Sequence, residues 1–184
     1  MKYFIKIFVL LLAAAVFQGC ELEKENVGEQ KSPGKEFLTI EKVIDGDTFK
    51  LSNGEKVRLL GIDTPEKFQS NKLESDSKKS GKDKKTLQKL GKLASDYVKG
   101  FAEGKKVYLE KEPNHEDRDR YGRLLRYIYF EDGTMINKKI IADGYAYVYD
   151  KFPLSKLDEF REAYREAREN QRGLWGDVKG LEKF

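Results

Sequence analysis

The chain has 184 residues, of which 36 are Lys or Arg and 32 are Asp or Glu, giving a formal net charge of +4 at pH 7. This near balance of charge does not mark a class of partner, and the length suits one compact domain with a tether. The single cysteine excludes an intrachain disulfide, and the single histidine excludes a mechanism that needs two. The sequence contains no glycine-rich nucleotide loop, no Cys/His metal cluster and no internal repeat.

Residues 1–19 have the pattern of a signal peptide. Lys2 and Lys6 accompany an apolar stretch at 7–17, which is shorter than the about 20 residues needed to span a bilayer. The sequence FQGC ends at Cys20 and resembles a bacterial lipoprotein cleavage box, in which the cysteine is lipidated. We therefore expect an exported protein, anchored to a membrane of the bacterial envelope through Cys20. The alternative is an ordinary secreted protein with one buried thiol.

A polar, charged segment at 20–36 follows the leader and is interrupted by glycine and proline, so it is predicted to be a flexible tether. The globular domain is predicted for residues 37–176, with a short tail at 177–184. No disulfide or second domain is expected in the mature chain.

The domain opens with three strand-like runs, at 37–44, 48–52 and 55–62. The dipeptides Asp45-Gly46 and Asn53-Gly54 separate them, and both are favoured in tight hairpin turns. The pattern therefore predicts an antiparallel meander.

Polar side chains mark both ends of this meander. Asp47 follows the first turn, so it is expected near the far end of the third strand. Simple alternation would put Arg58 and Asp63 on opposite faces, and Gly61 between them offers a place for a bulge or bend.

The third strand leads directly into Asp63-Thr64-Pro65-Glu66. Pro65 fixes its own φ and favours an extended Thr64, so the chain leaves the strand abruptly. The Asp63 carboxylate and the Thr64 carbonyl are then available as oxygen ligands for a hard cation such as calcium. Glu66 is placed to act as a base on water. The alternative is that this stretch only begins a helix.

Residues 67–85 are rich in Lys, Ser, Asp and Glu and are predicted to be a solvated loop. Its lysines either help to hold a polyanion or form an ordinary soluble surface, because acids are interspersed among them. The segment 86–101 has a helical stripe of apolar residues, which we assign to the core.

Further strands are predicted at 106–112, 124–130 and 134–136, the last two as a hairpin. The charged loop before this hairpin ends in a turn at Tyr121-Gly122, which places Arg123 at the mouth of a strand. Its guanidinium can grip a phosphate with two hydrogen bonds. The other arginines nearby are expected to pair with acids on a solvated surface: Arg118, Arg120 and Arg126.

Short helical and aromatic segments complete the chain. A helix is predicted at 137–142 and another at 155–170, the latter capped by Ser155, with Leu174 and Trp175 folding back onto the core. Two hairpin-rich groups of strands with a helix between them predict an α+β fold that is mainly a β barrel. This is the small closed five-stranded architecture of oligonucleotide-binding (OB) folds, which suits a single strand of nucleic acid.

Three segments carry a resemblance to the staphylococcal nuclease (thermonuclease) family. They are IDGDT at 44–48, RLLGIDTPE at 58–66, and DRYGR at 119–123 followed by YIY at 127–129. The resemblance covers residues 37–175 and implies a calcium-dependent phosphodiesterase that acts on DNA and RNA, built on a five-stranded barrel with three helices. In this family, cleavage frees the 5′ oxygen and leaves 3′-phosphate products.

The matched positions imply roles for individual residues. Asp47 and Asp63 would give carboxylates to calcium and Thr64 its main-chain carbonyl, while Glu66 would be the general base that deprotonates the attacking water.

The remaining matched residues would contact the substrate. Arg58 and Arg123 would hold the scissile phosphate and stabilise the five-coordinate transition state. The bound nucleotide would be contacted by Arg120, Tyr121, Tyr147 and Tyr149.

The expected partners are single-stranded or locally melted DNA and RNA, with the protein acting as a monomer. Two alternatives from other classes are a non-catalytic nucleic-acid-binding lipoprotein on the same barrel and a surface adhesin that binds polyanions through residues 67–85.

Overall fold

A computed structural model of the protein describes residues 36–67, 71–81, 83–113 and 115–176. The predicted signal peptide, Cys20 and nearly all of the tether lie outside these residues, as does the predicted tail at 177–184. Among the helices that the structure describes, none is long and apolar enough to cross a membrane.

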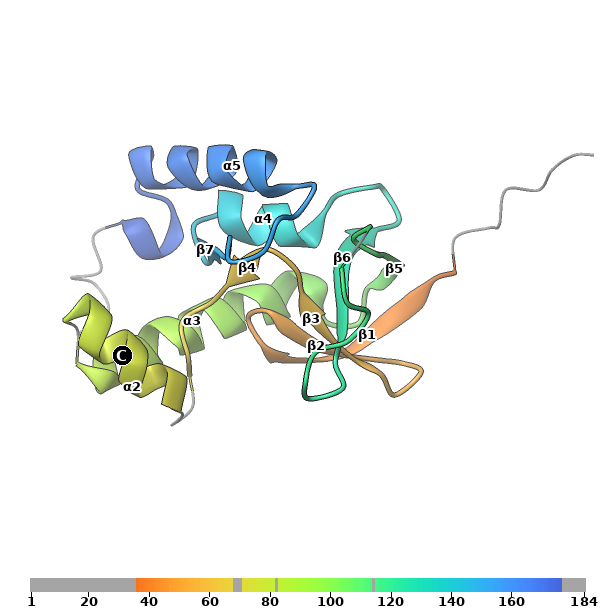
Figure 1. The fold of residues 1–184 in the computed structure, drawn as a ribbon, viewed down its shortest axis with the longest axis horizontal. Coiled ribbons are helices and arrows are strands. Elements are labelled where there is room, and N and C mark those ends of the chain that lie inside the picture. The colour runs from red at the N-terminus through yellow and green to blue at the C-terminus, as the bar shows by residue number, and fades with distance from the viewer. Residues whose placement is uncertain (1–35, 68–70, 82, 114, 177–184) are drawn as a thin grey trace, which may run out of the picture. The chain divides into compact units, whose positions relative to one another are not determined.

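Five strands close into a barrel, as the sequence predicted, and their order is β1-β2-β3-β6-β5 (Figure 1). The strands are β1 (Leu38–Asp45), β2 (Thr48–Leu51), β3 (Lys56–Leu59), β5 (Lys106–Glu110) and β6 (Leu124–Phe130). The meander β1-β2-β3 is antiparallel, and β5 closes the barrel against β1 and β6. The contact between β3 and β6 is parallel, with Arg58 opposite Leu125. The α+β, mainly β-barrel fold class is therefore confirmed.

The barrel interior is filled by apolar side chains from alternate strand positions. Each of these side chains is at most 1% exposed, so the apolar residues at alternate positions of the strands point into the core. They include Ile40, Phe49, Leu51, Val57, Leu59, Val107 and Ile128.

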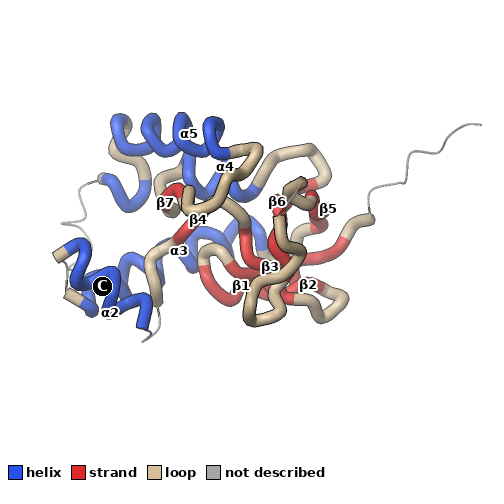
Figure 2. The backbone as a smooth tube through the Cα atoms, viewed as in Figure 1, coloured by secondary structure: helices blue, strands red, loops and turns tan. Residues whose placement is uncertain are grey.

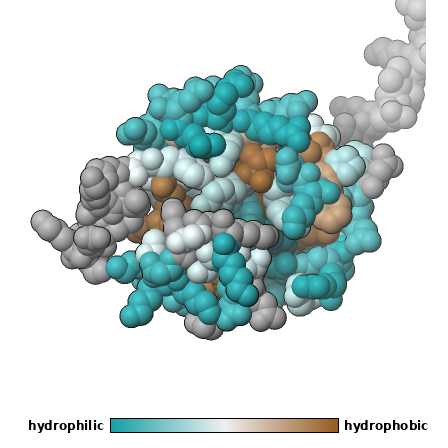
Figure 3. All heavy atoms as spheres, turned by 60° about the vertical axis from the view of Figure 1, so that its left-hand side comes forward, coloured by the Kyte–Doolittle hydropathy of each residue, from teal (hydrophilic) through white to brown (hydrophobic). Residues whose placement is uncertain are grey.

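Four α-helices are described, one more than the three expected. They are α2 (Asn71–Ser80), α3 (Lys84–Ala102), α4 (Ile136–Ala142) and α5 (Leu157–Glu169), followed by the 3₁₀ turn η1 (Gly173–Trp175). Helix α3 packs on β1, α4 on β6, and α5 on α4 (Figure 1). On the face drawn in Figure 3, most of the coloured surface belongs to hydrophilic residues.

Helix α2 corrects the prediction of a loop across 67–85. Leu73 is fully buried and packs against Leu87 and Leu90 of α3. Leu174 packs against the same cluster. One leucine is too weak a periodic signal to reveal an amphipathic helix, so α2 was not visible in the sequence.

Other strand boundaries also differ from the prediction. The run 55–62 divides into β3 and a short β4 (Ile62–Asp63), which pairs with β7 (Tyr147–Val148) in a separate two-stranded sheet. Figure 2 shows this pair among the helices rather than in the barrel. Residues 134–136 form no strand, and Met135 makes an isolated bridge to Tyr129.

Helix α5 begins at Leu157, not at 155. Ser155 does not cap it, because its backbone N–H and hydroxyl both donate to Glu112 Oε2, at 2.9 and 2.8 Å. Glu112 also accepts a hydrogen bond from the Tyr127 hydroxyl. Burial alone would raise the pKa of Glu112, but these hydrogen bonds hold it below its usual value.

Candidate active site

Asp47 joins the first hairpin to the end of β4. The Thr64 N–H and hydroxyl both donate to Asp47 Oδ2 at 3.1 Å, and both residues are buried. Gly46 makes this approach possible, since a Cβ there would lie 2.8 Å from Thr64 Cγ2. The meander therefore brings Asp47 to the far end of the third predicted strand, as expected.

Arg58 lies between two of the acids that the sequence singled out. Its Nη1 is 2.6 Å from Asp47 Oδ2 and its Nη2 is 3.0 Å from Asp63 Oδ1. The contact to Asp63 is a hydrogen bond, whereas Nη1 is buried and makes no well-directed hydrogen bond within the described residues. Gly61 has φ +72°, which turns the chain between β3 and β4, so Arg58 and Asp63 meet in spite of simple alternation.

Arg123 reaches the same group of residues from the second half of the chain. Its Nη1 donates to Thr48 Oγ1 at 3.2 Å, and the Thr48 hydroxyl donates to Asp47 Oδ1 at 3.0 Å. Its Nε donates to Asp119 Oδ2 at 2.7 Å. Burial would raise the pKa of Asp119, but its hydrogen bonds with Arg123 hold that pKa below its usual value.

Asp119 also shapes the loop that carries Arg123. Its Oδ1 accepts the backbone N–H of Tyr121 at 2.9 Å and of Arg123 at 3.0 Å, so one carboxylate folds the turn and aims the guanidinium. No role was predicted for Asp119 or Thr48 from the sequence. Their places inside the segments DRYGR and IDGDT were the signal that could have found them.

The other arginines of this region have different surroundings. Arg118 forms an exposed pair with Glu55, at 2.7 Å, as expected. Arg126 does not lie on a solvated surface, because it is 6% exposed in β6 and pairs with Asp117 at 2.7 Å. Strand pairing buried a side chain that the sequence placed with the loop arginines.

Acidic groups concentrate near Asp47. Asp45, which was predicted only as a turn residue, has its pKa raised to about 6, first by burial and then by the charge of Asp47. Glu66 raises it further, whereas the Gly46 N–H and the charge of Lys67 act in the opposite direction. Asp47 and Glu66 therefore each lie close enough to repel the Asp45 carboxylate, and a cation would relieve that repulsion.

The loop that carries Glu66 rests directly on α3. An added Cβ at Gly91 would lie 2.5 Å from the Glu66 carbonyl carbon and 2.6 Å from its oxygen. One helical turn further, the buried Ser95 accepts a hydrogen bond from Lys67 Nζ at 2.7 Å. The absence of a side chain at Gly91 thus sets how closely the loop approaches the helix.

Tyr121 is the most exposed of the candidate tyrosines, at 68%. The guanidinium carbons of Arg120 and Arg123 lie 4.8 and 5.5 Å from its ring centroid, and Arg120 Nη2 donates to its hydroxyl at 2.7 Å. An exposed ring beside Arg123 can contact a nucleotide.

Tyr147 and Tyr149 lie on and just after β7, next to the strand that carries Asp63. Tyr147 is the register partner of Asp63, and its ring packs edge-on against Trp175. The Tyr149 N–H donates to the Gly61 carbonyl at 2.9 Å. Their backbones thus border the site, although the Tyr147 ring is engaged in an aromatic cluster.

The donor chemistry fits a hard cation, because Asp47, Asp63 and Thr64 supply oxygen atoms within one contact network. Within the described ranges, no group of three or more His, Cys, Asp or Glu side chains is arranged to hold a metal ion. An ion here would therefore rely on two carboxylates, a carbonyl and further oxygen atoms from water or substrate.

A family model described as staphylococcal nuclease homologue matches residues 56–177 of this chain. The chain belongs to the staphylococcal nuclease family. The match begins at β3 and includes Arg58, Asp63, Glu66 and Arg123, whereas the hairpin that carries Asp47 precedes it.

Relatives of this nuclease include bacterial and archaeal proteins. The thermonuclease of Staphylococcus intermedius is 34% identical over 77% of each chain. The uncharacterized protein MJ1439 of Methanocaldococcus jannaschii is 37% identical over 73% of this chain and 69% of its own. Endonuclease YhcR of Bacillus subtilis (strain 168) is 27% identical over 85% of this chain, which spans only 13% of that relative. Membership of this family makes the protein a nuclease, hence a hydrolase.

Proposed function

We propose that the protein is a calcium-dependent nuclease that hydrolyses phosphodiester bonds of DNA and RNA in single-stranded or locally melted form. One observation carries this proposal. Arg58 and Arg123, which are far apart in sequence, are linked through Asp47 and Thr48 into one network beside the Glu66 loop. A phosphodiester repels an anionic nucleophile, so two guanidinium groups at one place suit its hydrolysis.

Asp47 and Asp63 through their carboxylates, and Thr64 through its main-chain carbonyl, would hold the calcium ion. Bound there, calcium neutralises phosphate charge and polarises the phosphorus–oxygen bonds as a Lewis acid. The guanidinium of Arg58 contacts both carboxylates, which supports the view that this pair of acids attracts cations.

Glu66 is the proposed general base. It takes a proton from the water that attacks phosphorus, and the new bond forms while the bond to the 5′ oxygen breaks. Arg58 and Arg123 donate hydrogen bonds to the phosphate oxygens and stabilise the additional negative charge of the five-coordinate transition state. The 5′ oxygen leaves and takes a proton from solvent, giving a 3′-phosphate product.

Tyr121 and Arg120 are the proposed contacts for the bound nucleotide, with Tyr147 and Tyr149 as further contacts. The exposed Tyr121 ring supports this assignment, since it is open to solvent next to Arg123. Base stacking on aromatic rings tolerates any sequence, which agrees with an enzyme that acts on both nucleic acids.

We also propose that the protein is exported, lipidated at Cys20 and active as a monomer in the bacterial envelope, with the nuclease domain at 37–176. The leader pattern at 1–19 and the sequence FQGC support this proposal.

The test is hydrolysis of a labelled single-stranded oligonucleotide by the full-length protein and by Glu66→Gln, with calcium and with a chelator. The substitution keeps the shape of the side chain and removes the base, so we expect turnover to be nearly abolished while strand binding persists. Cleavage that needs both calcium and Glu66 supports the proposal. A protein that binds the strand and never cuts it with any divalent ion would instead be the non-catalytic binding module.

A further inference from the structure

Charge is segregated along helix α3. From Lys84 to Ser95 the helix carries four lysines and no Asp or Glu. In contrast, α5 alternates acids and bases and forms ion pairs along its surface, such as Arg165 with Glu162 at 3.3 Å. The nearly balanced composition of the chain therefore does not explain the basic stretch of α3.

This arrangement works against the stability of the helix. Lys85 and Lys89 are four residues apart, a spacing at which like charges repel. Lys85 lies in the first turn, where the helix dipole disfavours cations, whereas its neighbour Lys84 pairs with Glu74 of α2 at 2.7 Å. A cost of this kind is expected where the positive charge serves binding.

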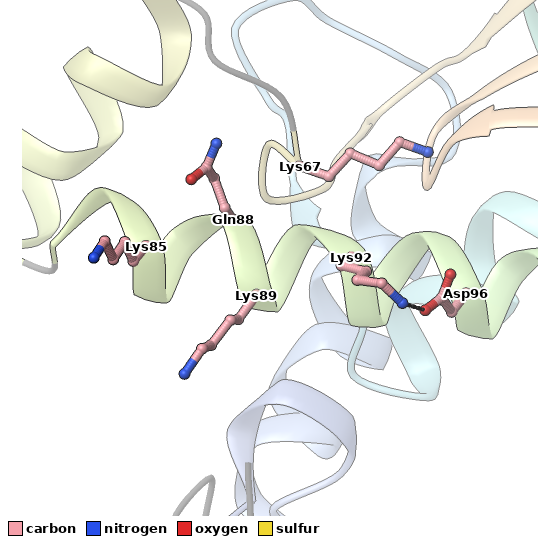
Figure 4. Close-up of a pocket in the computed structure, with 6 residues that line it drawn as sticks. All are labelled: Lys67, Lys85, Gln88, Lys89, Lys92 and Asp96. Atoms are coloured by element: carbon pink, nitrogen blue, oxygen red, sulfur yellow. Dashed lines mark hydrogen bonds and ion pairs between the residues drawn. The ribbon is translucent and has the colours of Figure 1, made fainter. Parts of the chain in front are cut away.

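Three of these lysines line a groove of about 660 Å³ on α3, together with Lys67 (Figure 4). Its lining residues are Lys67, Lys85, Gln88, Lys89, Lys92 and Asp96. Lys67 directly follows Glu66 in the chain, so the groove begins at the candidate active site.

The positive charge of this groove is only partly neutralised. Lys92 pairs with Asp96 at 2.6 Å, as Figure 4 shows. Lys85 and Lys89 are exposed and pair with no acid among the residues that the structure describes.

We propose that this groove, called here the α3 groove, binds the phosphodiester chain of the substrate on one side of the scissile phosphate. The proposal rests on the nuclease function above and adds to it a second, electrostatic binding site. Lys85 and Lys92 are separated along the helix axis by about 10 Å, the rise of about three stacked nucleotides. Lysines act as point charges, so the site follows the backbone and does not read sequence.

The decisive measurement uses the full-length double variant Lys85→Gln/Lys89→Gln. The matched control is Lys105→Gln/Lys106→Gln, which removes two exposed lysines at the opposite end of α3. The affinity for a single-stranded oligonucleotide of about 20 nucleotides is measured in chelator at several salt concentrations, so that binding is separated from cleavage. For the double variant we expect about tenfold weaker binding. We also expect the salt slope, which is the slope of the logarithm of affinity against the logarithm of salt concentration, to be smaller in magnitude by about 1.4, or about 0.7 for each lost phosphate contact.

Hydrolysis with calcium provides the second readout. The double variant should raise the KM for the long strand about tenfold, leave its kcat unchanged, and leave cleavage of a dinucleotide unchanged, because a dinucleotide does not reach the groove. The control variant should match the wild type in every measurement.

Several results would contradict the proposal that the α3 groove binds the strand. The first two are an unchanged salt slope in the double variant and an equal loss of affinity in the control variant. The others are an equal loss of dinucleotide cleavage in the double variant, or a wild-type protein that binds heparin with the same affinity and salt slope as the oligonucleotide. The heparin result would indicate a general polyanion surface, as in an adhesin. If the slope changes as expected but the wild type cuts no substrate, the groove stands and the proposed catalytic function fails.

Discussion

Gly91 lies where α3 touches the loop that carries Glu66, so Gly91→Ala adds one carbon atom at the base of the candidate catalytic group. The new Cβ would lie 2.5 Å from the Glu66 carbonyl carbon and from the Lys67 nitrogen, whereas ordinary contact begins at 3.4 Å. Helix and loop must separate by about 0.9 Å, since backbone atoms on both sides cannot rotate away.

The expected loss of activity follows from this distance. A displacement of about 1 Å at a reacting group lowers the rate about 100-fold, so kcat should fall by roughly that factor. The free energy of unfolding should fall only slightly, because two effects oppose each other. Overpacking destabilises by about 1–3 kcal/mol, while replacing a helical glycine by alanine stabilises by about 1 kcal/mol. Strand affinity should change much less than kcat, since Arg58, Arg123 and the exposed Lys85 and Lys89 do not lie on this loop.

Gly100→Ala is the matched control, because it lies in the same helix and an added Cβ there meets nothing within 4 Å. It should keep wild-type kcat and gain up to about 1 kcal/mol of stability. The assay measures kcat, strand affinity and thermal unfolding for both variants, together with the amide NMR shifts of Glu66 and Lys67. Wild-type kcat in a folded Gly91→Ala protein would refute the reasoning, as would a loss of kcat without movement of those amide signals.

Three further predictions concern other parts of the chain. Arg123→Lys should lower kcat by orders of magnitude, because a point charge cannot replace the guanidinium fork; a variant that cuts like the wild type would make Arg123 a surface charge. Glu112→Gln should cost about 1 kcal/mol at pH 7 after allowing for partial exposure, measured by urea unfolding. The pKa of Glu112 is lowered in the folded state, so its contribution is present above the unfolded value of 4.5 and is lost as pH falls through the folded value. The difference between wild type and variant should therefore shrink in acid, and a difference independent of pH would contradict this. Cys20→Ala should abolish lipidation and move the protein from the detergent phase to the aqueous phase, whereas unchanged partitioning would argue for simple secretion.

Much of the fold could be predicted because its signals are local. Asp45-Gly46 and Asn53-Gly54 have a strong preference for tight turns, so the meander and the place of Asp47 followed from neighbouring residues alone. The stripe of α3 likewise needed no distant contact, since one face of a helix with regular apolar spacing must be buried. The family resemblance followed from three short segments in order, which is also information within the sequence.

The sequence by itself thus predicted which residues are candidates for the chemistry, and it determined which turns bring the first strands together. Tertiary structure decided how those residues meet. Arg123 reaches Thr48 because β6 lies parallel beside β3, and helix α2 exists because Leu73 finds a cluster on α3. Gly91 acquires its role only when a distant loop is laid against it. These features depend on contacts between segments that are far apart in the chain. The local conformational preference of a residue does not specify which distant segment will pack against it.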